Sequence, residues 1–246
     1  MKREYKFISI YIVNLIVMAT IGLLALAFNK QVQNSDIFAL ILGLVVGLFR
    51  FAFDFSIAGG LIRNRMGSVG DYLNQVNYIN FRVLTVAFII SLITSVLAFF
   101  LKLTSGMLVF SAIANPNNDS VFSVGTFLLP IIILVVDLVF ALLVAYSTLY
   151  LADSYNVDEP VFTSIKNILL IGKRLIKKTL VIVLKFVILP IFIFVGILAV
   201  AFMVLGDDPF AIYGAIVFPV LIYASIANVI IKARLSDKYL DVKYLE

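Results

Sequence analysis

The residues of this sequence that could do chemistry are three charged side chains inside long apolar runs. Arg50 and Asp54 lie four residues apart in one run, and Asp137 lies near the centre of another. Because an ionised group at the centre of a bilayer costs at least about 2.5 kcal/mol, charges in such places are expected to pair. Asp54 is one helical turn from Arg50, and Asp137 could complete a triad. The three residues form a candidate buried charge cluster: either a site for an ion, a proton or a lipid headgroup, or a structural contact between two helices.

The rest of the composition offers little catalytic chemistry. The sequence has no His and no Cys, which excludes imidazole bases, thiol nucleophiles and most zinc sites. It also contains no P-loop, no HExxH and no GxSxG motif. We therefore expect no catalytic residue, no metal site and no cofactor, and we expect that the protein is not an enzyme.

Composition assigns the chain to the class of membrane proteins. Of its 246 residues, 63% are hydrophobic and 13% are charged, whereas soluble domains are nearer half apolar and a quarter charged. Several apolar runs reach the roughly 20 residues that a helix needs to cross the hydrocarbon, and they lack the alternation of a transmembrane β-strand. We expect an all-α, polytopic transmembrane helical bundle with one domain over residues 1–246. Its expected spans are about 7–28, 37–62, 83–101, 122–151, 180–205 and 211–231.

The basic residues indicate how the bundle is oriented. Of the 19 Lys and Arg residues, all but Lys30, Arg50 and Lys102 fall at the termini, in the loops or at the span ends on one side. Since Lys and Arg are enriched in cytoplasmic loops, we expect a multi-pass protein of the cell membrane with both termini in the cytoplasm. The first run, 7–28, is about twice as long as the apolar core of a signal peptide, which favours a retained span.

Two inner loops are expected to form amphipathic interfacial helices, at about 68–81 and about 160–178. The first begins with Ser68 and Asp71, a pair that resembles a capping box. The second combines an apolar stripe with a basic face. Its basic side chains either hold the loop in the cytoplasm and do no more, or also bind anionic headgroups at about 1 kcal/mol each. The candidate anionic-lipid contacts are Lys166, Lys173, Arg174, Lys177 and Lys178.

Small residues predict where helices approach one another. Gly43 and Gly47 form a GxxxG pair on the face of the second span that carries its charged residues. Ala141 and Ala145 form a comparable small face in the fourth span. Because small side chains let a second backbone approach closely, these four positions are candidate helix-packing sites.

Short motifs give the chain a resemblance to a known family. They are Phe-Ser-Ile-Ala-Gly-Gly-Leu-Ile-Arg (55–63), Tyr-Leu-Ala-Asp-Ser (150–154), Ser164 and Gly-Lys-Arg (172–174). In these motifs the chain resembles a bacterial family of six-helix integral membrane proteins of unknown function, similar to the membrane domain of glycerophosphodiester phosphodiesterases. The resemblance implies the fold, the compartment and an envelope-related role. The sequence lacks a phosphodiesterase catalytic domain, so the resemblance implies no activity.

Three functional hypotheses remain open at this point. The leading one is a non-enzymatic envelope protein that packs with membrane lipids, with a partner membrane protein or with a second copy of itself. The alternative is a small transporter or lipid-translocating protein that uses a midplane Arg/Asp site. An intramembrane enzyme is disfavoured by the missing His, Cys and motifs, and no nucleic-acid partner is expected. A solvent-accessible cavity at the buried charges would favour transport, and a dry helix interface would favour a structural role.

Overall fold

The computed structural model describes residues 3–34, 36–114, 124–205 and 218–243. Within these ranges every regular element is a helix, as the sequence predicted, and six helices are long and apolar enough to cross a membrane. The chain is therefore a multi-pass membrane protein with an all-α fold. The elements are α1 (Phe7–Asn34), α2 (Asp36–Arg63), α3 (Val69–Leu73), η1 (Asn74–Tyr78), α4 (Phe81–Ala114), α5 (Val124–Val144), α6 (Ser147–Asp153), α7 (Val161–Val183), η3 (Leu184–Ile188), α8 (Leu189–Leu205) and α10 (Phe218–Lys243).

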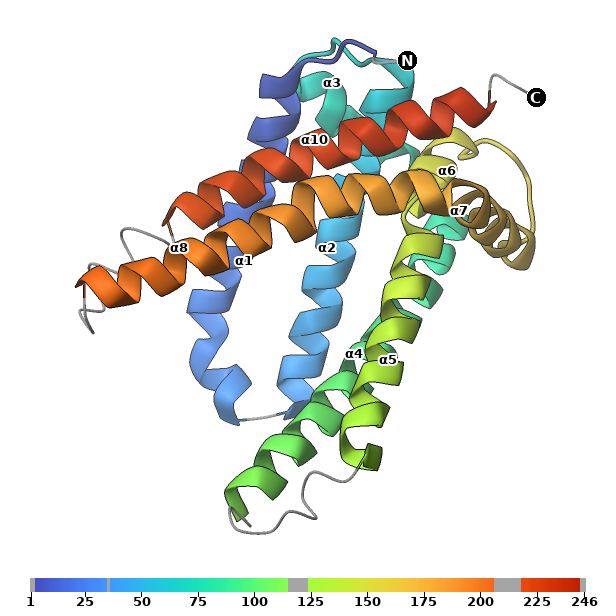
Figure 1. Ribbon diagram of the computed structural model, residues 1–246. Coiled ribbons are helices and arrows are strands. Elements are labelled where there is room, and N and C mark those ends of the chain that lie inside the picture. The colour runs from blue at the N-terminus through green and yellow to red at the C-terminus, as the bar shows by residue number, and fades with distance from the viewer. Residues whose placement is uncertain (1–2, 35, 115–123, 206–217, 244–246) are drawn as a thin grey trace.

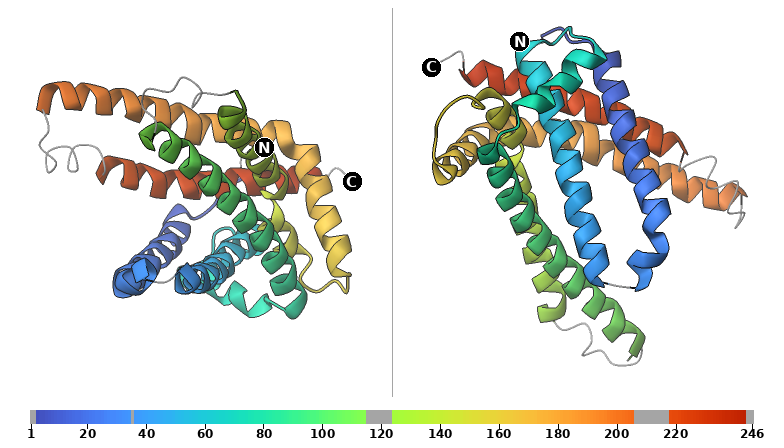
Figure 2. Two further views of the ribbon diagram at one scale, coloured as in Figure 1. Left: turned by 90° about the horizontal axis from the view of Figure 1, so that it is seen from below. Right: turned by 180° about the vertical axis from the view of Figure 1, so that it is seen from behind.

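The helices meet at one end of the molecule (Figure 1). α1 and α2 run antiparallel to each other, as do α4 and α5, and the second pair is tilted relative to the first (Figures 1 and 2). α10 packs against α7 and η3. Both ends of the chain lie at the common end together with α3 and α6 (Figure 1). We call this end the cap and define it by residues 3–6, 63–82, 150–167 and 234–243.

Three predicted spans lie almost wholly within single helices. The predicted spans 7–28, 37–62 and 83–101 fall inside α1, α2 and α4. The last predicted span, 211–231, lies partly outside the described residues. Its described part belongs to α10, which continues to Lys243 in the cap.

The first inner loop is less helical than predicted. Instead of one amphipathic helix over 68–81, it contains the short α3 followed by the 3₁₀-helix η1. The capping box at its start is confirmed: the backbone N–H of Asp71 bonds to the Ser68 hydroxyl, and the Asp71 carboxylate accepts from the Ser68 backbone N–H. These bonds lower the pKa of the exposed Asp71 carboxyl below its ordinary value.

Tyr72 fixes this loop to α2. Its ring is fully buried, and burial raises the pKa of its hydroxyl to about 12. The ring lies directly against Gly60, where any Cβ would overlap it. The backbone carbonyl of Tyr72 accepts a hydrogen bond from the Ser56 hydroxyl. A glycine in α2 therefore makes the close contact between helix and loop possible.

The second inner loop continues into the fifth span without a break. The predicted helix 160–178 and the predicted span 180–205 form one helical run, in which the π-helical turn η3 lies directly before Pro190. Proline has no N–H to offer the carbonyl one turn earlier, that of Phe186. The hydroxyl of Tyr223 on α10 donates to this carbonyl at 3.0 Å. A neighbouring helix thus satisfies the group that the proline leaves unpaired, which is how spans tolerate proline.

The fourth predicted span, 122–151, is broken between α5 and α6. At the break the Tyr146 side chain is fully buried, and its hydroxyl oxygen lies 2.8 Å from that of Thr179 on α7. Gly172, also on α7, approaches the carbonyl of Leu143 so closely that a Cβ would overlap it. The predicted span is confirmed as a candidate membrane span over Leu128–Asp153, although its helix is interrupted here, where α7 packs tightly; residues 122–123 lie outside the described residues.

Arg63 joins three segments of the cap. It ends α2, and its guanidinium carbon lies 4.8 and 4.7 Å from the ring centroids of Tyr78 and Tyr155, two rings that also contact each other. It also donates to the backbone carbonyl of Ala152 at 2.6 Å. The arginine therefore connects α2 to both inner loops through cation–π contacts and a charge-assisted hydrogen bond.

Ion pairs tie α10 to the rest of the cap. They reach the N-terminal segment, the first inner loop and the end of α6. The pairs are Arg3–Asp241 at 3.0 Å, Arg65–Asp237 at 2.8 Å and Lys243–Asp153 at 2.7 Å. Because these contacts hold the last turns of α10, they also fix the position of the residues one to three turns earlier, which include Lys232.

The contact between α7 and the helix break can be tested by adding one methyl group. Gly172→Ala should destabilise the protein by about 1–3 kcal/mol, because overpacking against a backbone carbonyl forces the helices apart. Gly196→Ala in α8 is the matched control, since a Cβ there meets nothing within 4 Å. It should leave stability unchanged or raise it slightly through helix propensity. Thermal unfolding in detergent measures both; equal melting temperatures for the two variants would contradict the close approach of α7.

Candidate functional site

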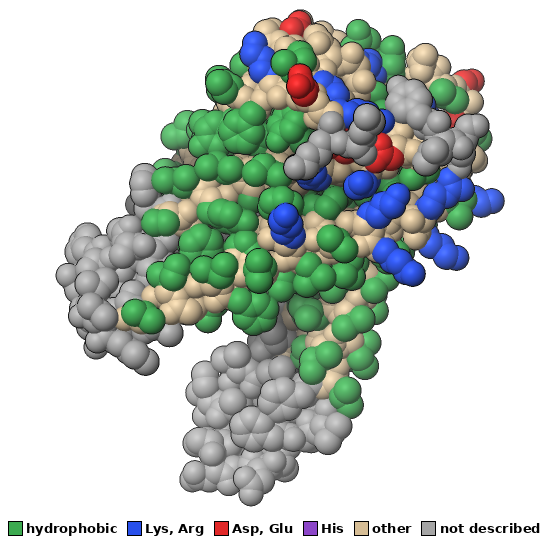
Figure 3. Space-filling view, turned by 45° about the horizontal axis from the view of Figure 1, so that its top comes forward, with side chains coloured by type: hydrophobic (Ala, Val, Ile, Leu, Met, Phe, Trp, Pro, Cys, Tyr) green, Lys and Arg blue, Asp and Glu red, His purple; other side chains and the backbone are tan. Residues whose placement is uncertain are grey.

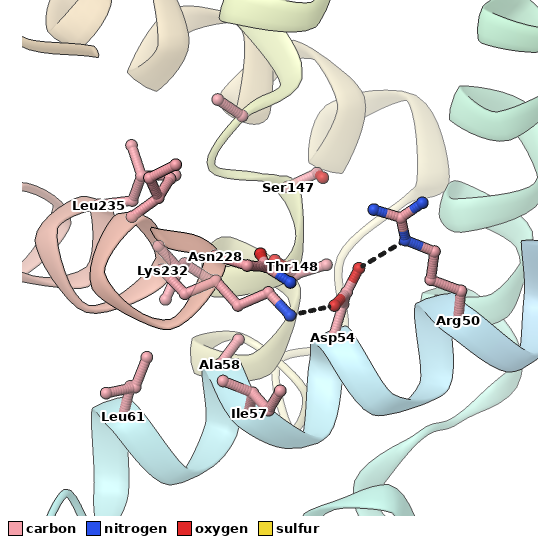
Figure 4. Close-up of a pocket in the computed structure, with 13 residues that line it drawn as sticks. Arg50, Asp54, Ile57, Ala58, Leu61, Ser147, Thr148, Asn228, Lys232 and Leu235 are labelled. Atoms are coloured by element: carbon pink, nitrogen blue, oxygen red, sulfur yellow. Dashed lines mark hydrogen bonds and ion pairs between the residues drawn. The ribbon is translucent and has the colours of Figure 1, made fainter. Parts of the chain in front are cut away.

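Asp54 lies between two basic side chains, in the half of α2 that is nearer the cap. The ammonium nitrogen of Lys232, on α10, lies 2.6 Å from one carboxylate oxygen of Asp54. Nε of Arg50, one helical turn before Asp54, lies 3.8 Å from the other oxygen. The two basic side chains approach from opposite sides (Figure 4). The predicted pairing of Arg50 with Asp54 is present, but the closer cation is Lys232.

An asparagine on α1 completes the contact. Asn14 is only 4% exposed, and its Oδ1 accepts hydrogen bonds from Lys232 at 2.9 Å and from Asn228 at 3.4 Å. The ammonium of Lys232 thus bridges α1 and α2 while belonging to α10. Polar contacts of this kind hold transmembrane helices together where hydrophobic burial contributes little.

Arg50 is held much less tightly than Lys232. Its side chain is 68% exposed in the isolated chain, against 29% for Asp54 and 19% for Lys232. At 3.8 Å the contact with Asp54 is an ion pair without hydrogen-bond geometry. Within the described part of the chain, the five N–H donors of the guanidinium therefore have no acceptor at hydrogen-bond distance.

Two cavities adjoin this cluster. One, of about 280 Å³, lies between α2, α6 and α10, and the other, of about 330 Å³, lies between α2, α4 and α6. Arg50, Asp54, Ser147 and Thr148 line both cavities, so the charged side chains stand at their junction. Figure 4 shows the first cavity with these residues around it.

The charges at this site do not balance. The charged residues that line the cavities, within the described part of the chain, are Arg50, Lys232 and Asp54, which gives one excess positive charge. At about 1.5 Å per residue, Asp54 lies about 14 Å along α2 from Arg63, within a helix that is apolar enough to span a membrane. A site of this charge, at this depth, can bind an anion by charge-assisted hydrogen bonds.

Asp137 lies away from this cluster. It lines neither cavity and forms no ion pair with any described residue. The predicted triad with Arg50 and Asp54 was wrong, because Lys232 occupies the position of the third charged group. Ser147 and Thr148 line both cavities instead, and they lie ten and eleven residues after Asp137, about 15 Å farther along the segment.

The small residues are divided between packed and open positions. A Cβ at Gly43 or Gly47 would meet nothing within 4 Å, so within the described chain the predicted helix packing at these two glycines was wrong. Gly47 instead lines the second cavity. Ala145 lines the first cavity, beside the helix break, and Ala141 is exposed.

The five basic residues predicted to contact anionic lipid share one exposed face of α7. Lys166, Lys173, Arg174, Lys177 and Lys178 are all exposed, whereas Arg63, Arg65 and Arg82 are engaged in the cap. Lys and Arg side chains gather along one side of the molecule in Figure 3. α7 carries this face opposite the buried residues Ser164, Ile168 and Leu175.

Sequence reasoning missed Lys232, Asn14 and Asn228. Lys232 was counted as an orientation residue, because it follows the last predicted span. Asn14 interrupts an apolar run, and a polar residue inside a span is itself a signal for a helix contact. Nothing in the sequence alone connects it to a lysine more than two hundred residues later.

The Lys232–Asp54 pair should matter for stability far more than the Arg50–Asp54 pair. Lys232→Met leaves the Asp54 carboxylate without its close partner, and it should lower the free energy of unfolding by up to about 3 kcal/mol. Adding Asp54→Asn should recover part of this loss. Arg50→Gln is the control and should cost less than about 1 kcal/mol, because the pair is long and exposed. Thermal unfolding in detergent compares the variants; an unchanged melting temperature for Lys232→Met would contradict the structural role of the pair.

Comparisons of the chain with protein-family models, with curated proteins and with solved structures each find no match, so the geometry of the site carries the functional argument.

Proposed function

We propose that this chain is a non-enzymatic, envelope-related protein of the cell membrane that binds the phosphate of an anionic lipid headgroup beside Arg50 and Lys232. The observation that carries the proposal is the excess positive charge at the junction of two cavities, within helices apolar enough to span a membrane. Asp54 balances one of the two cations. An anion from the bilayer would balance the other.

The chemistry of Arg50 favours phosphate. A guanidinium offers paired N–H donors whose spacing matches two phosphate oxygens, and Arg is the preferred residue for such contacts. The hydroxyls of Ser147 and Thr148 line the same cavities and offer further donors. A guanidinium in the apolar zone is costly when its neighbouring carboxylate is already held by another cation, as Lys232 holds Asp54, so occupation by a phosphate would stabilise the folded protein.

The size of the cavities favours a headgroup over a whole lipid. Both lie near the lower end of the volumes typical of ligand sites, which are about 300–1,000 Å³. A phosphate and its headgroup alcohol would fit within them, whereas two acyl chains would not. The chains would remain in the bilayer, against exposed apolar side chains of α4 and α5 such as Leu92, Val96 and Val135.

A role in lipid translocation or small-molecule transport is the second candidate. The observation that favours it is the broken helix α5–α6, because discontinuous helices beside midplane polar residues are a recurring feature of transporter binding sites. The same anion site would serve in either case. Inorganic phosphate and glycerol 3-phosphate share the recognised group with a lipid headgroup, so they distinguish a soluble substrate from a lipid.

The proposal also assigns the side of the membrane that the cap faces and the surface that a partner would contact. Both termini lie at the cap, and the exposed basic residues of α7 lie nearby, so the cap would face the cytoplasm and anionic headgroups of the inner leaflet. A cysteine introduced at the exposed position Lys166 would report this orientation, through its protection from an impermeant thiol reagent in intact cells. The open surface around Gly43 would face lipid or a partner membrane protein, including a second copy of the chain.

Lipid binding to the purified protein tests the proposal. In native mass spectrometry with added phosphatidylglycerol, Arg50→Gln should weaken the tightest lipid-binding event about tenfold, which corresponds to a loss of about 1.4 kcal/mol. Phosphatidylcholine should bind less tightly than phosphatidylglycerol to the wild-type protein. Inorganic phosphate and glycerol 3-phosphate should not displace the bound lipid at millimolar concentration.

Lys177→Gln is the matched control, since it removes one positive charge from the exposed face of α7. It should leave the tightest event unchanged and reduce only the weaker binding that disappears as salt rises. If Arg50→Gln binds phosphatidylglycerol as tightly as the wild type does, the site is a structural contact between helices. If glycerol 3-phosphate displaces the lipid, the ligand is a soluble anion.

A further inference from the structure

The cavity between α2, α4 and α6 is rich in hydroxyl groups. Five serine and threonine side chains line it, three from one face of α4 and two from the first turn of α6. They are Ser91, Thr94, Ser95, Ser147 and Thr148. All of them lie within the candidate membrane spans Phe81–Leu101 and Leu128–Asp153. Such a concentration of hydroxyls is unusual in a lipid-facing zone, where small polar groups normally find a partner within the protein.

Four of these hydroxyls are available to a ligand. Thr94 donates to the carbonyl of Ile90 at 3.0 Å, the usual arrangement for threonine within a helix. Ser91, Ser95, Ser147 and Thr148 form no hydrogen bond with any described residue. An unpaired hydroxyl in an apolar environment is costly, and each can both donate and accept. Ser95 is exposed and the other three are half-buried, so a ligand that both donates and accepts could reach these hydroxyls.

The hydroxyl-lined cavity is continuous with the charged site. Arg50, Asp54, Ser147 and Thr148 line this cavity and also the one between α2, α6 and α10. A phosphate beside Arg50 would therefore have the hydroxyls of α4 on one side. Gly47 keeps this side open, since a Cβ there meets nothing within 4 Å.

We infer that the ligand is a phosphodiester lipid whose headgroup alcohol itself carries hydroxyl groups, glycerol being the simplest. The phosphate lies beside Arg50, and the hydroxyls of the headgroup bond to those of Ser91, Ser95, Ser147 and Thr148. The inference rests on the proposed function, because it assigns the headgroup of the same lipid. It adds a basis for specificity: the cations select the negative charge, and the hydroxyl-lined cavity selects the alcohol.

The test compares two lipids of equal charge. Phosphatidylglycerol and phosphatidylethanol with the same acyl chains both carry one phosphodiester charge, and they differ in the two hydroxyls of the headgroup. In native mass spectrometry the wild-type protein should bind phosphatidylglycerol at least about fivefold more tightly, as expected for one or two additional neutral hydrogen bonds. Ser91→Ala combined with Ser95→Ala should bring this ratio close to one while leaving the affinity for phosphatidylethanol unchanged.

A second variant tests the same cavity by filling it. Gly47→Leu should fold, because the position is open, and it should reduce the binding of phosphatidylglycerol to the level of phosphatidylethanol. Equal binding of the two lipids by the wild-type protein would overturn the inference, as would a ratio that survives both variants. A different result would contradict the proposed function. If Arg50→Gln binds phosphatidylethanol as tightly as the wild-type protein does, no lipid phosphate lies beside Arg50.

Discussion

The ion pair between Lys232 and Asp54 is the contact on which the rest of this structure depends. It joins α10 to α2 at a distance of 2.6 Å, and through Asn14 it also includes α1. The pair leaves Arg50, one turn away, as a largely exposed cation. A structural contact and a candidate binding site therefore share one carboxylate. The fully paired lysine holds the helices together, while the loosely paired arginine is available to an anion.

The cap keeps that contact in place. Arg3, Arg65 and Lys243 tie α10 to three other segments, so the position of Lys232 follows from ion pairs at the cap end of the same helix. The short sequence motifs at 55–63 and 150–154 lie at this end or directly beside it. In segment 55–63, Gly60 admits the ring of Tyr72, and in segment 150–154 the Asp153 carboxylate accepts from Tyr239 and Lys243. These motifs therefore correspond to packing and ion pairs of the cap.

The sequence predicts the helices well because length and hydropathy are local properties. It predicts the pairing of Arg50 with Asp54 for the same reason, since the two are one turn apart. It does not predict Lys232, because the contact between α2 and α10 depends on how distant segments pack. The break before Ser147 is equally invisible, since no proline or glycine lies there and the contacts of Tyr146 and Gly172 with α7 and α5 are tertiary. Asp137 was misplaced for the same reason as Lys232 was missed, because the level at which α5 faces Arg50 depends on tertiary packing.

In the proposed function, a lipid phosphate lies beside Arg50, within the membrane. Photo-crosslinking in vesicles tests this most directly, using a phosphatidylglycerol with a diazirine next to the phosphate and peptide mapping of the adducts. The account predicts adducts in the peptides that line the two cavities, residues 45–58 and 145–151, and their loss in Arg50→Gln. Adducts confined to the basic face of α7, or adducts at the cavities that persist in Arg50→Gln, would contradict it.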